Sequence, residues 1–465
     1  MDILIAVAIL GVISLIAEIF NLRKAIVPVT VIGLIAVLGH AVYKAMYGTT
    51  LLNWELDESQ YFNMVQSTKY GLAFSSLFIL LTIFLVTLSA DFHKNHQPKI
   101  SDFVAIKLFL LTGAIAMVSF GNMAMFFLGI EILSISLYVL AASEPKNVKS
   151  NEAGMKYFLM GAFASGILLF GIALIYGATG TFDIPTIMSL NNTNLPSWYT
   201  IGSVLIAIGL LFKIAAVPFH FWASDVYEGS PALTTATMST LAKVAAMASF
   251  FKLITSLNPH LPGFLTTINI VAVLSMIVGN LIALRQINVK RMLAFSGIAH
   301  AGYMMLAFQF LDYTNAQANL FYYAAAYALA GIAAFAVVLS VCGNRGNEEI
   351  YNFNGLGKTN PLLAGILTCA LLSMAGIPIF SGFFAKFFLF DQVLDKGRLI
   401  LVIFAVISSI ISVGYYFKLI LAMYTKDSTE EVQPVPVAYT IVAVASIALN
   451  IIIGLVPSFV IGLVR

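Results

Sequence analysis

Long apolar runs separated by short polar stretches recur along the whole chain. A helix needs about 20 mainly apolar residues to cross the hydrocarbon core of a membrane, and fourteen runs meet that requirement. They lie near residues 2–20, 25–47, 70–90, 103–120, 122–142, 153–177, 199–222, 231–256, 264–284, 290–311, 318–342, 359–390, 398–424 and 435–460. Only FGNM divides the stretch 103–142, and only the predicted loop ASDVYEGSP divides 199–256. Because the runs are continuous, unlike the short alternating strands of a β-barrel, they predict an all-α polytopic membrane protein with about 14 transmembrane helices.

The composition supports a membrane protein and argues against other classes. Of the 465 residues, 60% are hydrophobic and 10% are charged, whereas soluble domains carry about 25% charged residues. The first apolar run lacks a basic region and a small-residue cleavage site, so we expect it to remain as the first helix. The net charge of +3 is spread along the chain without a basic block, which argues against a nucleic-acid partner.

The sequence offers no pattern typical of a cofactor site. Cys342 and Cys369 are its two cysteines, too few for a disulfide framework or for an iron-sulfur cluster held by this chain. No GxxxxGK pattern occurs that would bind a nucleotide phosphate. The spacing of Gly161, Gly166 and Gly171 indicates close helix packing. We therefore expect this chain to bind neither a cofactor nor a metal ion.

Lysine and arginine are distributed unequally between the two sets of loops. If the N-terminus lies outside, the inward loops hold Arg23, Lys24, Lys94, Lys99, Lys146, Lys149, Arg285, Lys290, Arg291, Arg345, Lys358 and Lys426. The outward side holds Lys44, Lys69, Lys252, Lys396, Arg398 and Arg465. Twelve basic residues in the inward loops against six on the outward side favour an outside N-terminus. An even number of helices places the C-terminus outside as well. The longest polar stretch, roughly residues 48–69, is too short to form a soluble domain.

A few ionisable residues fall inside the predicted spans. The four deepest are Glu131, Lys213, Lys243 and Lys386. An ionisable side chain at membrane depth costs about 2.5–3.5 kcal/mol, so we expect these four to face an internal, hydrated path. For Glu18 and Lys107 we expect the side chain to extend to the membrane interface. Lys156 and Lys418 also lie within reach of helix ends.

Two interpretations of the buried charges remain open. Glu131 could neutralise one lysine in a buried pair that fixes the helix packing. One carboxylate cannot neutralise three lysines, so at least two of them need another explanation. Burial disfavours the charged form of a lysine, which would allow proton exchange near neutral pH. A neighbouring charge changes that equilibrium by roughly 1.4–4 kcal/mol, comparable with the ~2.3 kcal/mol required to move one proton through 100 mV.

Two of the lysine-bearing spans also contain helix breakers. In GLLFKIAAVPFHFW, Pro218 removes a backbone donor and clashes with the preceding turn, so the helix should be broken near residues 215–219. In SMAGIPIFSGFFAKFF, the residues Gly376, Pro378 and Gly382 interrupt the apolar run ahead of its lysine. Paired broken helices are typical of transporters built from inverted repeats, whose substrate sites lie near the midplane.

The two broken helices suggest how a single membrane domain, 1–465, is divided. We predict three N-terminal helices in 1–102, a first repeat of helices 4–8 in 103–256, a second repeat of helices 9–13 in 264–424, and helix 14 in 435–460. Because each repeat holds five helices, the two copies would have opposite topology in the membrane.

Two of the six histidines, His220 and His300, are candidates for a role inside the membrane. His300, in KRMLAFSGIAHAGYM, is a candidate proton relay through its neutral imidazole. A single buried histidine also commonly serves as a hydrogen-bond partner between helices, and both roles remain open for His300. We expect His220, beside Pro218, to be mainly structural.

Several of these motifs together carry a resemblance to a known family. FKIAAVPFHFWASDVYEGSP followed by LAKVAAM, with KRMLAFSGIAHAGYM and GIPIFSGFFAKFFLF, resembles the antiporter-like membrane subunits of NADH-quinone oxidoreductase, respiratory complex I. The likeness covers nearly the whole chain, and the DVYEG loop at 225–229 is specific for the N branch over its paralogues L and M. The chain departs from the family at Pro231–Ala232–Leu233, where the family usually has Pro-Thr-Pro, so the geometry of this helix start does not carry over.

The resemblance implies a function and a set of partners. It implies fourteen helices, inverted repeats and a proton channel that uses Glu131, Lys213, Lys243 and Lys386. It also implies that NADH, FMN, iron-sulfur clusters and quinone are bound by partner subunits, and that this chain assembles with the other complex I membrane subunits in the plasma membrane of a bacterium. The reaction of the whole assembly would be proton-translocating NADH:quinone oxidoreduction.

Two further functions compete with this one. The chain could belong to a multi-subunit sodium/proton antiporter without a redox partner, whose subunits share positions like Lys213 and Glu131; the DVYEG loop argues for the first function. The chain could instead be a scaffold that moves no protons, but a scaffold has no need of buried charges. We expect the proton-translocating subunit of complex I.

Overall fold

The structure is a computed structural model that describes residues 1–20, 22–48, 63–96, 100–190, 195–257, 263–309, 313–343, 345–427 and 434–464. The helices in the first half are α1 (Asp2–Ile19), α2 (Arg23–Tyr47), α3 (Lys69–His96), α4 (Ile100–Ser119), α5 (Met123–Ala141), α6 (Val148–Thr179), α7 (Ile184–Leu190), α8 (Ser197–Lys213), α9 (Phe221–Gly229), α10 (Ala232–Thr237), the π-helical turn η2 (Met238–Ala242) and α11 (Lys243–Leu257). The second half contains α12 (Phe264–Leu284), α13 (Val289–Met305), η3 (Leu306–Gln309), α14 (Tyr313–Cys342), η4 (Ile350–Phe353), α15 (Leu356–Thr359), α16 (Pro361–Ala375), α17 (Ser381–Asp395), α18 (Leu399–Thr425), α19 (Val437–Leu455) and α20 (Pro457–Gly462). Lys99, Arg465 and residues 49–62 of the predicted polar loop lie outside the described residues.

The all-α membrane fold predicted from the apolar runs is confirmed. Each of the fourteen runs contains at least one helix, and eleven helices within the described ranges are long and apolar enough to cross a membrane. The division of 103–142 is also correct, because α4 ends at Ser119 and Asn122 caps the start of α5 through the Ala124 N–H. The count of fourteen transmembrane helices and the inverted repeats remain predictions.

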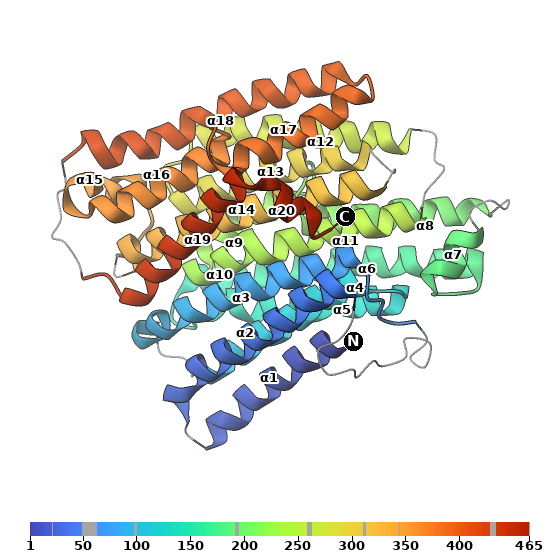
Figure 1. Ribbon diagram of the computed structural model, residues 1–465, viewed down its shortest axis with the longest axis horizontal. Coiled ribbons are helices and arrows are strands. Elements are labelled where there is room, and N and C mark those ends of the chain that lie inside the picture. The colour runs from blue at the N-terminus through green and yellow to red at the C-terminus, as the bar shows by residue number, and fades with distance from the viewer. Residues whose placement is uncertain are drawn as a thin grey trace.

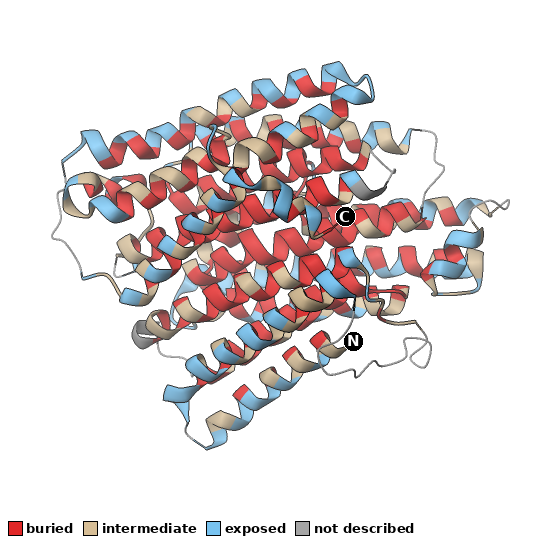
Figure 2. Ribbon diagram, viewed as in Figure 1, coloured by how far each residue is buried: buried red, intermediate tan, exposed pale blue. Residues whose placement is uncertain are grey.

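The core lies in the middle of a wide bundle. The helices run side by side along roughly one direction, with α1 and α2 at one edge and α18 at the opposite edge (Figure 1). The central helices are buried along most of their length, whereas the outer helices expose one face (Figure 2). The two most buried spans are Ala232–Leu257 and Asn315–Cys342. Exposed apolar side chains on the outer helices are those that a bilayer would contact.

Both predicted helix interruptions are present. The first helix stops at Lys213 and resumes at Phe221 as α9, and the second stops at Ala375 and resumes at Ser381 as α17. Side chains satisfy backbone groups at the first break, where Ser275 Oγ accepts from the Val217 N–H at 2.9 Å. The prediction of a loop at ASDVYEGSP is wrong for most of these residues, because the chain becomes helical again after Pro218 and α9 continues to Gly229.

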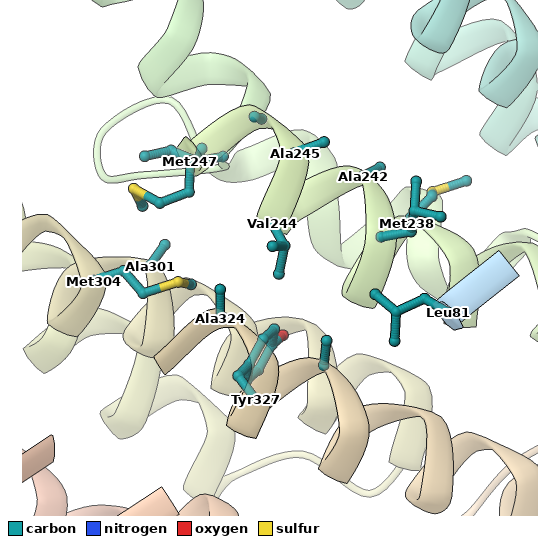
Figure 3. Packing of buried hydrophobic residues seen from close by; sticks show 14 of the residues in the cluster. Leu81, Met238, Ala242, Val244, Ala245, Met247, Ala301, Met304, Ala324 and Tyr327 are labelled. Carbon is teal, nitrogen blue, oxygen red and sulfur yellow. The ribbon is translucent and has the colours of Figure 1, made fainter. Parts of the chain in front are cut away.

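The span that departs from the family pattern starts as an ordinary helix. Pro231 is the N-cap before its first residue, Ala232, so the missing N–H of proline costs no helical hydrogen bond. The irregularity follows α10, at the π-helical turn η2 just before Lys243. Ala301 of α13 and Ala324 of α14 lie in the buried core near Val244 and Tyr327 (Figure 3).

We predict that Gly382→Ala disrupts the second broken helix. An added Cβ would overlap the Ser373 carbonyl oxygen on α16, so the two half-helices would have to separate. Overpacking of this kind costs about 1–3 kcal/mol, which should lower the midpoint of thermal unfolding of the protein in detergent. Gly166→Ala is the control, because nothing lies within 4 Å of its added Cβ. Equal midpoints for the two variants would contradict the predicted contact.

Candidate functional site

Lys213 and Glu131 share one polar region between α8 and α5. Lys213 Nζ donates to Ser134 Oγ at 2.6 Å and to the Tyr138 hydroxyl at 3.4 Å. Glu131, Ser134 and Tyr138 are spaced three and four residues apart, so they share a face of α5. The charge of Glu131 acts on Lys213, but the two form no ion pair in the described part of the chain, and Glu131 Oε1 has no hydrogen-bond partner there. The direct buried pair considered from the sequence is therefore absent from this conformation.

Lys243 is enclosed without a hydrogen-bond partner. Its side chain is 2% exposed, and Nζ makes no hydrogen bond within the described ranges. The ammonium lies 5.8 Å from the centre of the Tyr227 ring on α9, a distance compatible with a weak cation–π contact. Gly297 on α13 leaves the space for it, because a Cβ there would lie 2.6 Å from Lys243 Nζ and 2.9 Å from the Tyr327 hydroxyl.

Lys386 has all three N–H donors engaged. Nζ donates to the carbonyl oxygens of Met374 at 3.0 Å and Ala375 at 2.8 Å, and to Ser409 Oγ at 2.8 Å. The two carbonyls are free because α16 ends at Ala375, and a helix C-terminus also carries partial negative charge that favours a cation. The break in the helix thus supplies the acceptors that the buried lysine needs.

His300 lies between the last two lysines. Its Nδ1 is 2.8 Å from the Tyr323 hydroxyl, and its Nε2 is 3.3 Å from the Tyr416 hydroxyl. The ring centres of His300 and Tyr327 are 4.8 Å apart, and the charges of both Lys243 and Lys386 act on this imidazole. Its two nitrogens therefore join hydroxyl groups on two different helices, α14 and α18.

Aromatic side chains fill the space between Lys213 and Lys243. Tyr138 packs against Tyr157 at 4.9 Å between ring centres, and Tyr157 stacks on Trp222 at 4.7 Å. Trp222 contacts Tyr227 at 6.4 Å, and Tyr227 faces Lys243. The sequence analysis missed this row, which joins the residue that binds Lys213 to the residue that faces Lys243.

The expectation for Lys107 is wrong. Its side chain does not extend to the interface but is 2% exposed inside the bundle, where it hydrogen-bonds Ser89 on α3. Lys107 is thus a further buried cation, and its position well inside an apolar run was the available signal. Glu18 pairs with Arg23 at 2.6 Å near the end of α1, and its extension to the membrane interface stays a prediction. In the part of the chain that the structure describes, no group of three or more His, Cys, Asp or Glu side chains is arranged to hold a metal ion.

Comparison with known proteins gives a consistent family. Residues 121–412 match the model of the family described as NADH:quinone oxidoreductase/Mrp antiporter, TM. The chain is 62% identical to an NADH-quinone oxidoreductase subunit N from Flavobacterium johnsoniae, over 100% of both chains. It is 42% identical to an NADH-quinone oxidoreductase subunit N from Cytophaga hutchinsonii, over 98% of each.

Solved structures show the same fold. A chain of respiratory complex I from Thermus thermophilus with bound aureothin superposes with a TM-score of 0.83 at 28% identity, covering 99% of this chain and 98% of that one. A chain of an Mrp complex from Dietzia gives a TM-score of 0.82 at 20% identity, over 99% and 95% of the two chains. At that lower identity the second likeness concerns the fold alone.

We predict that Gly297 is required because Lys243 occupies the space beside it. Replacing a helical glycine with alanine normally stabilises a helix by about 0.5–1 kcal/mol. Gly297→Ala should give no such gain and should destabilise the protein by about 1 kcal/mol, because its Cβ would displace the Lys243 ammonium at the end of its flexible side chain. In a Lys243→Ala background most of that cost should disappear. A double-mutant cycle on thermal unfolding in detergent measures this coupling, and additive effects would show that the two residues do not compete for space.

Proposed function

Because this chain belongs to the NADH:quinone oxidoreductase/Mrp antiporter membrane family, we infer that it is subunit N of an NADH-quinone oxidoreductase and translocates protons. It is a multi-pass protein of a bacterial plasma membrane. Proton movement is driven by electron transfer from NADH to quinone in partner subunits, which hold FMN and the iron-sulfur clusters. The other membrane subunits of complex I are its neighbours in the assembly.

One observation carries this proposal. Lys213, Lys243 and Lys386 lie inside the bundle, and none of them forms an ion pair with a carboxylate in the described part of the chain. A cation kept merely for packing would be expected to pair with a carboxylate, because an unpaired buried charge is costly. A lysine that alternates between ammonium and amine does not need a permanent counter-ion.

Each group has a proposed role in proton transfer. Lys213 exchanges the proton, and Glu131 favours the charged form of Lys213 when the two approach. Lys243, on the far side of the aromatic row, is the next group to exchange a proton, and His300 relays it toward Lys386 through its two hydroxyl partners. Lys386 leads to the outward side. A neighbouring charge changes each step by roughly 1.4–4 kcal/mol, which is enough to act against a membrane potential.

The arrangement of repeats and termini forms part of the proposal. Residues 103–256 and 264–424 are the two inverted repeats, following three N-terminal helices in 1–102 and preceding helix 14 at 435–460. Each repeat contributes one broken helix that ends or begins beside a lysine. Both termini lie on the outward side, as the excess of lysine and arginine in the opposite loops favours.

A sodium/proton antiporter subunit is the second candidate. The fold is shared with a chain of the Dietzia Mrp complex, but at 20% identity, compared with 62% to a full-length NADH-quinone oxidoreductase subunit N. The difference in identity favours the complex I subunit. Genes for NADH:quinone reductase subunits next to this one would agree with that assignment.

We predict that Lys213→Ala and Glu131→Ala assemble into the complex but pump poorly. Lys213→Ala removes the exchanging amine, and Glu131→Ala removes the charge that acts on it. NADH-driven proton uptake into inverted membrane vesicles, normalised to assembled complex, should fall roughly tenfold or more for Lys213→Ala and by less for Glu131→Ala. Lys418→Ala, at the inward end of α18, is a matched control. Full activity in both test variants would overturn the proposed site.

We predict that Lys386→Arg assembles but loses proton transfer. Arginine keeps the positive charge and can donate to the carbonyls that end α16, yet it does not release its proton in a protein. A purely structural cation would tolerate the change. The measurement is again NADH-driven proton uptake per assembled complex. Uptake at the wild-type rate would show that titration of Lys386 is not part of the mechanism.

A further inference from the structure

The short half-helix α9 carries two carboxylates that bind cations on both sides of it. Arg291 Nη1, from α13, lies 3.1 Å from Asp225 Oδ1 and 2.9 Å from Glu228 Oε2. On the other side, Lys156 Nζ of α6 lies 3.2 Å from Asp225 Oδ2, and Lys149 Nζ lies 3.9 Å from Glu228 Oε1. Each carboxylate is therefore shared between a lysine of α6 and the single arginine of α13. We call these five residues the α9 clamp.

The clamp joins the two proposed repeats. Its α6 and α9 members belong to residues 103–256, and Arg291 belongs to 264–424. A neighbouring hydrogen bond also joins the two proposed repeats, because Lys290 Nζ donates to the Ser230 carbonyl oxygen at 2.9 Å just after α9 ends. Without Arg291, the two carboxylates of α9 would be held by α6 alone.

The half-helix needs such support because it is interrupted at both ends. Residues 214–220 separate it from α8, and Ser230 and Pro231 separate it from α10. Its last residue, Gly229, lies so close to α6 that a Cβ would be 2.6 Å from the Lys149 carbonyl oxygen. Close packing therefore fixes one side of α9 on α6, and ion pairs fix the other side on α13.

The clamp and the proton path meet on α9. Tyr227 stands between Asp225 and Glu228 in the sequence, is 1% exposed, and places its ring 5.8 Å from Lys243 Nζ. Asp225 is 43% exposed and Glu228 is 30% exposed, and Glu228 and Arg291 line a cavity of about 510 Å³, so each ion pair alone contributes little to stability. What the shared arginine fixes is the position of the half-helix, and with it the ring that faces Lys243.

We propose that Arg291 is a positioning residue for proton transfer, which holds α9 across the seam between the repeats so that Tyr227 stays against Lys243. This inference rests on the proposed role of Lys243. It explains the DVYEG sequence in physical terms: the aspartate and glutamate bind the arginine, the tyrosine faces the lysine, and the glycine permits the approach to α6.

The test compares protons taken up with NADH oxidised in inverted vesicles that contain the whole complex. Arg291→Gln should lower the ratio of protons to NADH about threefold or more, because a small displacement of a transfer group has a large effect on rate. A merely structural loss would reduce the amount of complex, and both rates equally, leaving the ratio unchanged. Arg291→Lys should recover only part of the ratio, since one ammonium does not reproduce the fork of the guanidinium.

A substitution of the partner carboxylate and a matched control complete the design. Glu228→Gln removes the charge that pairs with Arg291 at 2.9 Å and should lower the ratio in the same direction as Arg291→Gln. Arg285→Gln removes an exposed cation at the end of α12, which forms no ion pair to α9 in the described residues, and should leave the ratio unchanged. If Arg291→Gln fails to assemble, Arg291→Lys and Glu228→Gln decide the question.

The outcomes separate this inference from the proposed function. Lys243→Ala, measured in parallel, should lose proton uptake. If it does so while the Arg291 variants keep the wild-type ratio, the clamp has no positioning role although the proton path stands. If Lys243→Ala pumps normally, the proposed path itself is wrong. An equal fall in Arg285→Gln would assign the effect to surface charge and overturn the clamp.

Discussion

A lysine inside a membrane protein must find its hydrogen-bond acceptors within the protein, because the hydrocarbon supplies none. The placement of the broken helices follows from this constraint. At Lys386 the chain ends α16 early, and the carbonyl oxygens of Met374 and Ala375 that this end leaves free accept two of the three lysine protons. A continuous helix would have used those carbonyls for its own backbone. The interruption that weakens the helix thus stabilises the charge beside it.

The three lysines meet this constraint to different degrees. Lys386 is fully engaged, Lys213 binds two hydroxyls of α5, and Lys243 has a ring and a glycine beside it and no acceptor in the described ranges. Such unequal environments give each site a different balance between ammonium and amine, which a directional transfer requires. The π-helical turn before Lys243 belongs to the same arrangement, since such turns frequently occur where a helix must present a functional side chain.

Packing between the two halves of the chain brings these separate sites close to one another. His300 on α13 reaches hydroxyls on α14 and α18, and Tyr227 on α9 reaches Lys243 on α11. The helices that bring them together, α11, α13 and α14, are buried along nearly all of their length, with alanine side chains among the core residues between them (Figure 3). A rigid centre of this kind holds small distances between groups that are far apart in the sequence.

The sequence by itself determined the fold class, the apolar runs, both helix interruptions and the burial of Lys243 and Lys386, because each depends on local chemistry. Proline removes a donor wherever it stands, and an ionisable residue in a long apolar run is costly in any bundle. Which groups meet was decided only by the tertiary structure. The burial of Lys107 beside Ser89 and the absence of a Glu131–Lys213 ion pair in the described residues both depend on helices distant in sequence, whose positions follow from packing and not from spacing along the chain.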